Sequence, residues 1–505
     1  MASFTSLSTY DARTIIPEFR GLNQYTGGDI NADIRYSADA VNIETINGLL
    51  QPAAKCELLT PQLTAPIETL AHFYRRWYTG VDNNELLIAA SGGKLYYMAP
   101  NATAWTQLAF PSGVQAYESN VWSCASYEIN PIGSTAPIDV LLLSNAKDGM
   151  IMVKGDNLAV LAVNTPKKFG VIARYAERIW GGAIPDDPDM LVYSAPFDPT
   201  DWTANQEHPE DGAGDIQQPS WDGDSFTSIR QFGAQLIAFK RTKVWRVLGT
   251  DPGEYAFKEQ YGGGAPYDKT IAIDAERILM LSDQGVVYYD GLTVNPFMQE
   301  ACQDIFKTMN VSKLDKAAAC LWHEKYYLSF PVGTSTYNNR VLVYNAVDNT
   351  WLLRDDVCIE TFLPTEHDLY FTSSVAPGRI FKWHENSWET GECTESACRW
   401  VTPWTDFSRK DIVKGGHEVY LLMEIKDDPV TLKISIQSEK KIKTKKYTLK
   451  PLSAAQEAKN RKYKQKRIHF GGSGRRFRLI IETDAGQPVW RLNSGLMVLS
   501  EIDPD

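Results

Sequence analysis

A plan of four short strands recurs along the middle of the chain, and this repetition restricts the fold more than any other feature. Between residues 67 and 391 each unit runs strand, loop, strand, tight Gly or Asn/Asp turn, strand and short aromatic strand. Seven units of about 46 residues each match the length of four-stranded propeller blades. We therefore predict an all-β fold with a β-propeller of about seven four-stranded blades. Six or eight blades, or two or three stacked sandwiches, are the alternatives.

Aromatic residues support this prediction. They make up 11% of the chain, with 14 Trp and 24 Tyr. The third strand of several units ends in aromatics, as at residues 94–97, 287–289 and 380–383. A single four-stranded sheet cannot bury both faces alone, so we expect these large side chains to fill the space between neighbouring blades.

The two ends of the chain lie outside the repeat. We interpret residues 1–66 as an extended N-terminal arm, in which residues 39–45 supply a strand that closes the propeller of residues 67–391. A short helix is expected at residues 299–309, and a fourth strand of the last blade at 387–389. In the C-terminal region, residues 392–505, the pattern changes, and residues 398–505 hold longer alternating strands. This pattern predicts a C-terminal antiparallel β-sandwich, which contains a basic insertion at residues 440–467.

The sequence lacks the groupings that catalysis needs. Its seven His residues are scattered, and no nucleophile elbow, P-loop or dinucleotide fingerprint is present. Cys393 and Cys398 form the one close cysteine pair, with no second pair to complete a zinc site. We predict no enzyme activity, no cofactor and no metal. No apolar run approaches the ~18 residues of a membrane span, and the first residues do not resemble a signal peptide, so we expect cytosolic synthesis.

Charge is distributed unevenly in this chain of net charge −11. Residues 186–224 are rich in acids, and residues 199–223 contain no Lys or Arg. A hydrated insertion between blades explains this pattern, and a docking surface is the competing interpretation. The candidate docking acids are Glu207, Glu210, Asp211, Asp215, Asp222 and Asp224.

The opposite charge gathers in residues 440–467, which hold twelve Lys or Arg and one acid, Glu457. We expect a short helix at residues 453–461, inserted between two strands. The candidate residues for partner docking or phosphate contact are Lys440, Lys441, Lys443, Lys445, Lys446, Arg461, Lys462, Lys464, Lys466 and Arg467. Only Tyr447 and Tyr463 are interleaved, too few for a base-stacking platform, so we favour protein docking over phosphate contact.

Three stretches of the chain resemble the β-propeller proteins of tailed-phage virions, which are found at the neck, tail tube or nozzle. They are residues 19–24 followed by 39–42, residues 178–182 followed by 191–202, and residues 475–479 through 495–504. The most specific is Arg178-Ile-Trp-Gly-Gly182, then a strand and an Asp-Pro-x-x-Trp turn that ends at Trp202. The basic insertion departs from the family pattern.

The resemblance implies a structural subunit of the virion neck or tail, synthesised in the host bacterial cytoplasm. It further implies a ring of this chain, six copies being expected, with contacts to other neck and tail proteins. Such a ring would form part of the conduit through which double-stranded DNA passes without sequence-specific binding. The alternatives are a carbohydrate- or host-receptor-binding propeller, for which exposed Trp and Tyr would stack on sugars, and a cellular propeller scaffold.

Overall fold

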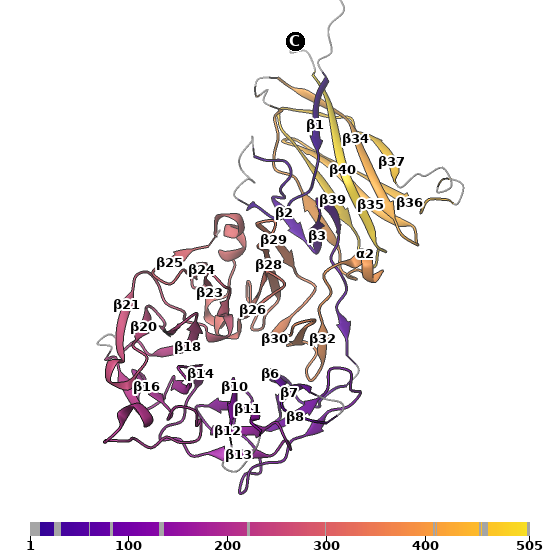
Figure 1. Ribbon diagram of the computed structural model, residues 1–505. Coiled ribbons are helices and arrows are strands. Elements are labelled where there is room, and N and C mark those ends of the chain that lie inside the picture. Colours follow the sequence, from indigo (N-terminus) through magenta and orange to yellow (C-terminus); the bar gives the residue numbers. More distant parts are fainter. Residues whose placement is uncertain are drawn as a thin grey trace, which may run out of the picture.

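The computed structural model describes residues 11–24, 32–59, 61–80, 84–130, 136–219, 223–297, 299–407, 410, 412–453, 456 and 463–501. These residues form two β-domains, a ring of small sheets and an elongated sandwich beside it (Figure 1). No helix among them is both apolar enough and long enough to cross a bilayer.

Seven four-stranded antiparallel sheets make the ring, and in six of them the strands lie in the order in which they follow one another along the chain. Blade one holds β6 (Ile67–Tyr74), β7 (Glu85–Ser91), β8 (Lys94–Met98) and β9 (Thr106–Gln107). Blade two holds β10 (Ser123–Ile129), β11 (Ile138–Asn145), β12 (Gly149–Lys154) and β13 (Val160–Val163). Blade three holds β14 (Val171–Tyr175), β15 (Arg178–Gly182), β16 (Met190–Tyr193) and β17 (Gly214–Gln217), with η2 (Pro209–Asp211) before β17.

Blades four to six follow the same order, and blade seven does so for its first three strands. Blade four holds β18 (Phe226–Phe232), β19 (Gln235–Lys240), β20 (Val244–Leu248), η3 (Pro252–Glu254) and β21 (Ala256–Gln260). Blade five holds η4 (Asp268–Thr270), β22 (Ala272–Ile273), β23 (Ile278–Ser282), β24 (Gly285–Tyr289) and β25 (Val294–Pro296). Blade six holds β26 (Ala318–Trp322), β27 (Lys325–Phe330), β28 (Arg340–Asn345) and β29 (Thr350–Arg354). Blade seven holds β30 (Ile359–Pro364), β31 (Leu369–Ser373) and β32 (Ile380–Lys382).

The predicted propeller and its seven repeats are therefore confirmed. The expected helix is also present, as η5 (Gln299–Cys302) and α1 (Gln303–Phe306), and η6 (Val311–Lys316) follows it. Aromatics at the end of the third strand do fill the space between blades. Tyr289 of β24 is fully buried, and its hydroxyl donates to the Gln260 side chain of blade four at 3.2 Å.

The ring closes with a strand other than the predicted one. β5 (Glu57–Leu58) pairs with β32 and becomes the fourth strand of blade seven. The predicted fourth strand at residues 387–389 is instead α2 (Ser387–Thr390), because Asn386 caps its first turn and Gly391 adopts φ +78 at its end. The predicted closing segment also lies elsewhere, since β2 (Asp39–Val41) and β3 (Ile43–Ile46) belong to the sandwich.

The sandwich consists of two antiparallel sheets that combine both ends of the chain. The five-stranded sheet has the order β2, β33 (Cys398–Val401), β39 (Phe477–Thr483), β35 (Val430–Ser438) and β36 (Ile442–Leu449). The seven-stranded sheet has the path β3, β4 (Leu49–Pro52), β40 (Trp490–Glu501), β34 (Lys414–Ile425) and β37 (Lys464–His469). In addition, β1 (Asp11–Ile16) pairs with β40, and β38 (Ser473–Gly474) pairs with β34. The described part of the N-terminal segment is thus mostly sandwich strand rather than a free arm.

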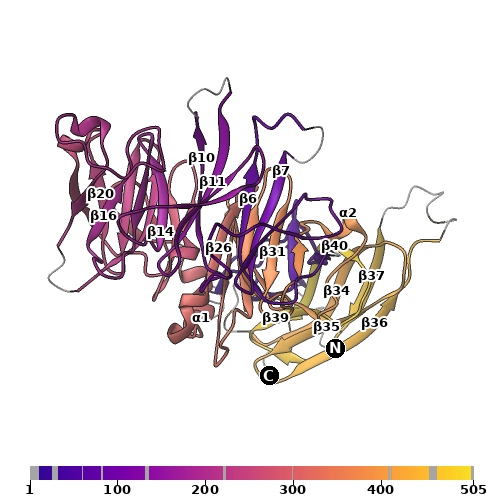
Figure 2. The ribbon, with the colours of Figure 1, turned by 90° about the horizontal axis from the view of Figure 1, so that it is seen from below.

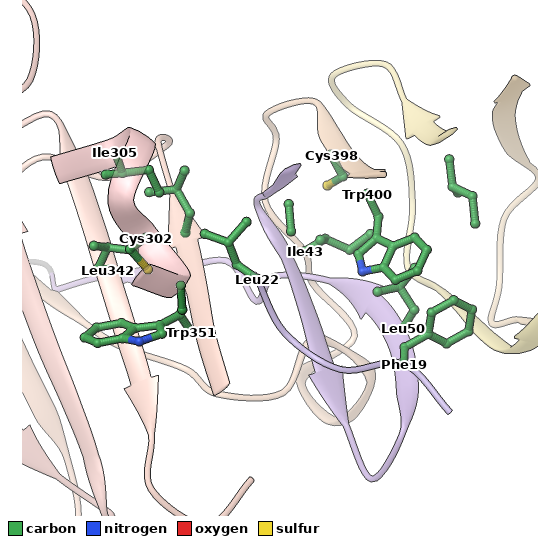
Figure 3. Packing of buried hydrophobic residues seen from close by; sticks show 14 of the residues in the cluster. Phe19, Leu22, Ile43, Leu50, Cys302, Ile305, Leu342, Trp351, Cys398 and Trp400 are labelled. Carbon is green, nitrogen blue, oxygen red and sulfur yellow. The ribbon is translucent and has the colours of Figure 1, made fainter. Parts of the chain in front are cut away.

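The two domains share one hydrophobic core. A single cluster of buried residues runs from blades five and six into the sandwich, and Figure 3 shows its central part. Trp351 of β29 and Trp400 of β33 are fully buried on its two sides, and Leu22 lies between them. The Phe19 ring meets the Trp400 ring edge-on at 5.0 Å. Because this apolar surface is continuous, separating the domains would expose it to water.

A buried ionic network lies in the same joint. The Arg354 guanidinium, 2% exposed, pairs with Asp356 at 2.7 Å and lies 3.6 Å from Glu44 of β3. It also donates to the Ala54 carbonyl at 3.0 Å, and Thr394 donates to Asp356 at 2.6 Å. Blade six, the N-terminal segment and the sandwich are therefore joined by charge as well as by apolar contact.

Candidate interaction surfaces

The basic insertion forms the open side of the sandwich. β36 and β37 are the last strands of the two sheets, and both lie at the end of the molecule away from blade three (Figures 1 and 2). Eight predicted docking residues lie on these strands or on the turn before β36: Lys440, Lys441, Lys443, Lys445, Lys446, Lys464, Lys466 and Arg467. Arg461 and Lys462, and most of the helix predicted at 453–461, lie outside the described residues.

The strand register places some of the cations of β36 and β37 on the inner faces of the two sheets and the others on the outer faces. Lys443 and Lys445 pair with Ile436 and Ile434 of β35, which are buried between the sheets. Lys464 and Lys466 pair in the same way with the buried Met423 and Leu421 of β34. Because side chains alternate along a strand, these four lysines face the gap between the two sheets at its open side. We call Lys443, Lys445, Lys464 and Lys466 the basic seam.

Two of the seam lysines lie over aromatic rings that pack against the core of the sandwich. The Lys466 ammonium lies 4.5 Å from the centre of the Tyr447 ring, so a β37 side chain reaches across to β36. The Lys445 ammonium lies 5.6 Å from the Phe470 ring. The aliphatic stems thus cover apolar surface while the charges remain in water.

Two of the predicted cations that face outward, Lys446 and Arg467, have carboxylate partners, whereas the seam lysines have none among the described residues. Lys433 and Lys446 share Asp484, and Arg467 and His469 share Glu418. Hydrogen bonds from Arg467 and Tyr420 hold the pKa of Glu418 at about 2. In the described part of the chain, no carboxylate lies within ion-pair distance of a seam lysine.

A small cavity of about 210 Å³ marks one end of the seam. Its apolar lining comes from Ile436, Phe470 and Phe477, all buried. Lys440, Lys441 and Lys443 contribute the charged part of the lining, and Gly471 and Gly472 lie against the Lys443 side chain. The cavity therefore combines an apolar surface with three lysine side chains.

The acidic insertion lies on blade three. Glu207, Glu210, Asp211 and Asp215 are exposed, and Asp222 lies outside the described residues. Asp224 is instead buried and accepts hydrogen bonds from the Arg241 and Thr242 backbone N–H groups at 2.9 and 3.0 Å. It stabilises the turn between β19 and β20 and does not contribute to an exposed docking surface.

A buried arginine holds the insertion in place. Arg178 of β15, 2% exposed, donates to the backbone carbonyls of Ser194, Glu210 and Gly212, those of Ser194 and Gly212 at 2.7 and 2.6 Å. The ligand atoms of His208, Glu210 and Asp211 lie within 4.8 Å of one another, but all three side chains are exposed. An exposed group of this kind is ordinary on an acidic surface.

The propeller axis contains a second cavity, of about 630 Å³, lined by the first strands of the blades. Its charged lining includes Arg230 and Asp268, which pair at 2.7 Å, and Lys269, whose pKa is lowered by burial. This volume is that of a small-molecule pocket.

Sequence reasoning located the two charged segments but missed two features of them. It missed the inward register of the seam, although the alternation Lys443-x-Lys445 and Lys464-x-Lys466 is a visible signal. It also missed that Arg178 organises the acidic insertion, because the acceptors are backbone carbonyls distant in sequence.

No family model matches this chain, and no curated protein matches it. Among solved structures, it is similar to the Pan2 WD40 domain of Neurospora crassa, with 8% identity and a TM-score of 0.36, covering 66% of this chain and 97% of that one. It is also similar to BamB from Moraxella catarrhalis, with 11% identity and a TM-score of 0.35, covering 74% of this chain and 99% of that one. The propeller assignment rests on the strand pairing described above.

Proposed function

We propose that this chain is a structural subunit of a tailed-phage virion, forming an oligomeric ring in the neck or tail that contributes to the DNA conduit. The observation that carries the proposal is the rigid joint, in which propeller and sandwich share one core and strands from both ends of the chain. A subunit that transmits load between neighbours needs such a body. An enzyme would need assembled catalytic groups instead.

The stretches that resemble phage proteins support this role, because they build structure. In Phe19–Gln24, Phe19 contacts Trp400, and the Leu22 N–H donates to the Trp351 carbonyl at 2.7 Å. A side chain at Gly21 would meet that same carbonyl, because its Cβ would lie 2.4 Å away. The second stretch supplies Arg178, and Trp202, whose ring packs on Phe169 at 5.1 Å. These two stretches therefore hold the domains and the blade-three insertion in a fixed position.

The charge distribution also supports assembly. The acidic insertion on blade three and the basic open side of the sandwich lie at opposite ends of the molecule in both views (Figures 1 and 2). Two separate docking surfaces on a rigid body allow each copy to contact two neighbours. The axial cavity of the propeller is the size of a small-molecule pocket, so the conduit would run through the centre of the ring of copies.

Mass photometry and cryo-electron microscopy of the purified chain, with and without the products of neighbouring genes, test the proposal. We expect a closed ring, of six copies, with a central opening wide enough for duplex DNA. A chain that stays monomeric and joins no portal or tail ring would contradict the proposal.

A carbohydrate-binding propeller is the second candidate, and one observation favours it. Tyr74 and Trp77, at and just after the end of β6, are about half exposed, and the Trp77 indole N–H donates to Glu128 at 3.0 Å. Exposed rings beside a carboxylate suit stacking and hydrogen bonding to a sugar. Glycan-array binding that is lost in Trp77→Ala would support this candidate over the virion subunit.

A further inference from the structure

β36 and β37 are both edge strands. Within the described residues, β36 has β35 as its one strand neighbour and β37 has β34. The other side of each strand therefore presents backbone N–H and C=O groups to which a further strand can bind. In proteins, such edges are either protected against pairing or they bind an extended peptide as an added strand.

Inward-facing lysines by themselves are a common way to protect an edge. Two features of the seam go beyond protection. The lysines come from both sheets and converge on one gap, and no described carboxylate pairs with any of them. A cavity with an apolar lining, which Lys443 shares with the two further lysines Lys440 and Lys441, opens at one end of the same row. Protecting the strand edges against pairing would require neither lysines from both sheets at one gap nor a cavity beside them.

We propose that the basic seam binds an extended acidic segment of another protein chain, which adds to β36 as a further strand. The inference deepens the proposed function and rests on it for the setting, in which the segment belongs to a neighbouring virion protein. The free edge of β36 supplies backbone hydrogen bonds to the segment. The seam lysines make the site specific for a segment with acidic side chains.

Strand geometry defines what the segment looks like. Alternate side chains on a strand are about 6.8 Å apart, and a strand paired with β36 places its side chains directly opposite those of β36. Acids at every second position therefore lie opposite Lys443 and Lys445, and they also face Lys464 and Lys466 across the gap. An apolar residue at the end of the segment fits the cavity beside Phe470 and Phe477.

The described strands of this chain do not provide such a segment, since none carries acids at successive alternate positions. The exposed acids of blade three lie mostly in turns and in η2, and β17 carries only Asp215. Within the described strands, this chain therefore offers no such segment, and we take a different chain as the partner.

Single-stranded nucleic acid is a poorer fit. Binding of bases needs aromatic faces that are free to stack. The Tyr447 ring lies beneath the Lys466 ammonium, and Phe470 is 3% exposed beneath Lys445. The seam thus offers charge and strand edges rather than stacking surfaces.

Fluorescence anisotropy with labelled peptides tests the inference on the full chain. The probe is a nine-residue peptide of alternating Glu and Thr that ends in Phe, and the comparison peptide has the same composition with its Glu residues in one block. We expect the alternating peptide to bind at least tenfold tighter than the block peptide. Substituting Lys443, Lys445, Lys464 and Lys466 together by Gln should weaken binding at least tenfold, whereas substituting all four by Arg should preserve it.

A matched control replaces four exposed propeller lysines, Lys94, Lys258, Lys307 and Lys316, by Gln and should leave binding unchanged. Circular dichroism verifies that each variant is folded. Equal binding of both peptides, or tighter binding of oligothymidylate at equal charge, would overturn the inference in favour of a general polyanion surface. Absence of peptide binding together with self-association of the Gln variant would show that the lysines only protect the edges.

The proposed ring and the proposed peptide binding at the basic seam can be refuted independently. Peptide binding is a property of one copy, so it is measured at concentrations where mass photometry shows monomers. A chain that binds the alternating peptide but joins no ring would refute the proposed function. A ring whose assembly tolerates the Gln variant, with no peptide binding, would refute the seam alone.

Discussion

The propeller and the sandwich are both all-β, yet their strands find partners in opposite ways. Six of the seven blades consist of strands that follow one another in the sequence. In the sandwich, β1 pairs with β40 at the far end of the chain, with Asp11 opposite Ser500. Blade seven is intermediate, because its last strand comes from residues 57–58. Local hairpins close small loops, whereas the sandwich and the last blade must bring distant segments together at a higher entropic cost.

This difference in strand pairing affects how the two domains respond to mutation. A blade completed by its own hairpins can persist when a neighbour loosens, whereas the sandwich requires the N-terminal strands and the shared core. We therefore expect changes in the joint to loosen the N-terminal strands of the sandwich, whereas equally destabilising changes in a single blade leave those strands in place.

The largest effect is expected for Trp400→Ala. Trp400 is fully buried between Phe19 and the sandwich sheets, and removing a buried Trp costs about 3–5 kcal/mol. Trp180→Ala, at an equally buried position in blade three, is the matched comparison. Denaturant unfolding should show a similar loss of free energy for both. Limited proteolysis should then release the N-terminal segment in Trp400→Ala only, and release in both variants would contradict the comparison.

Arg354→Leu comes next. It leaves the Asp356 carboxylate buried without its cationic partner and should lower the free energy of unfolding by about 3 kcal/mol. The double variant Arg354→Leu/Asp356→Asn, which removes both charges, should recover part of this loss. A double variant no more stable than the single one would show that the network does not join the domains electrostatically.

A pH-dependent effect is expected at Glu44. Burial raises the pKa of Glu44 to about 7, from an ordinary value of 4.5, although the charge of Arg354 opposes the shift. The folded state therefore holds this proton more tightly than the unfolded state. Its contribution to stability is complete below about pH 4.5 and is lost as the pH rises through about 7.

Glu44→Gln tests this directly. At pH 8 the variant should be more stable than wild type by about 1–3 kcal/mol, and the gain should disappear towards pH 5. Glu276→Gln, at an exposed position, is the control and should show no such pH dependence. A pH-independent difference between Glu44→Gln and wild type would contradict the prediction.

The smallest effect is expected at the ring closure. The Leu59 N–H donates to the Ile380 carbonyl at 3.0 Å, next to β5, so Leu59→Pro removes one hydrogen bond of the closing strand. We expect a loss of about 1–2 kcal/mol and faster amide hydrogen exchange in β32 than in other third strands. Exchange that accelerates equally in all blades would show that the ring opens as one unit.

Sequence periodicity was sufficient to predict the number of blades but not to predict which strand completes the last blade. The turns and aromatic strand ends repeat at short range, so seven units could be counted without knowing how they pack. The short strand Glu57–Leu58 carries too few residues for any periodicity to be visible. Residues 39–46 do have strand character, but strand character does not indicate which sheet a strand joins.

For the charged surfaces too, the sequence indicated where the charged residues lie along the chain but not how each side chain is placed. Composition identified residues 440–467 and 186–224 as unusual, and most of the named side chains are exposed in the structure. Asp224 is buried, which the sequence could not indicate, because a carboxylate that accepts backbone hydrogen bonds has the same sequence appearance as one in water.

The sequence by itself determined the all-β class, the seven repeats, the change to longer strands after residue 391 and the positions of the two charged segments. These features depend on residue types at short spacings, and short spacings are set by local backbone geometry. Only the tertiary structure decided which strand closes the ring, that both ends of the chain build one sandwich, and that lysines of two sheets face one gap. Those outcomes depend on pairing between distant segments, where many partners are locally equivalent and the shared core selects one.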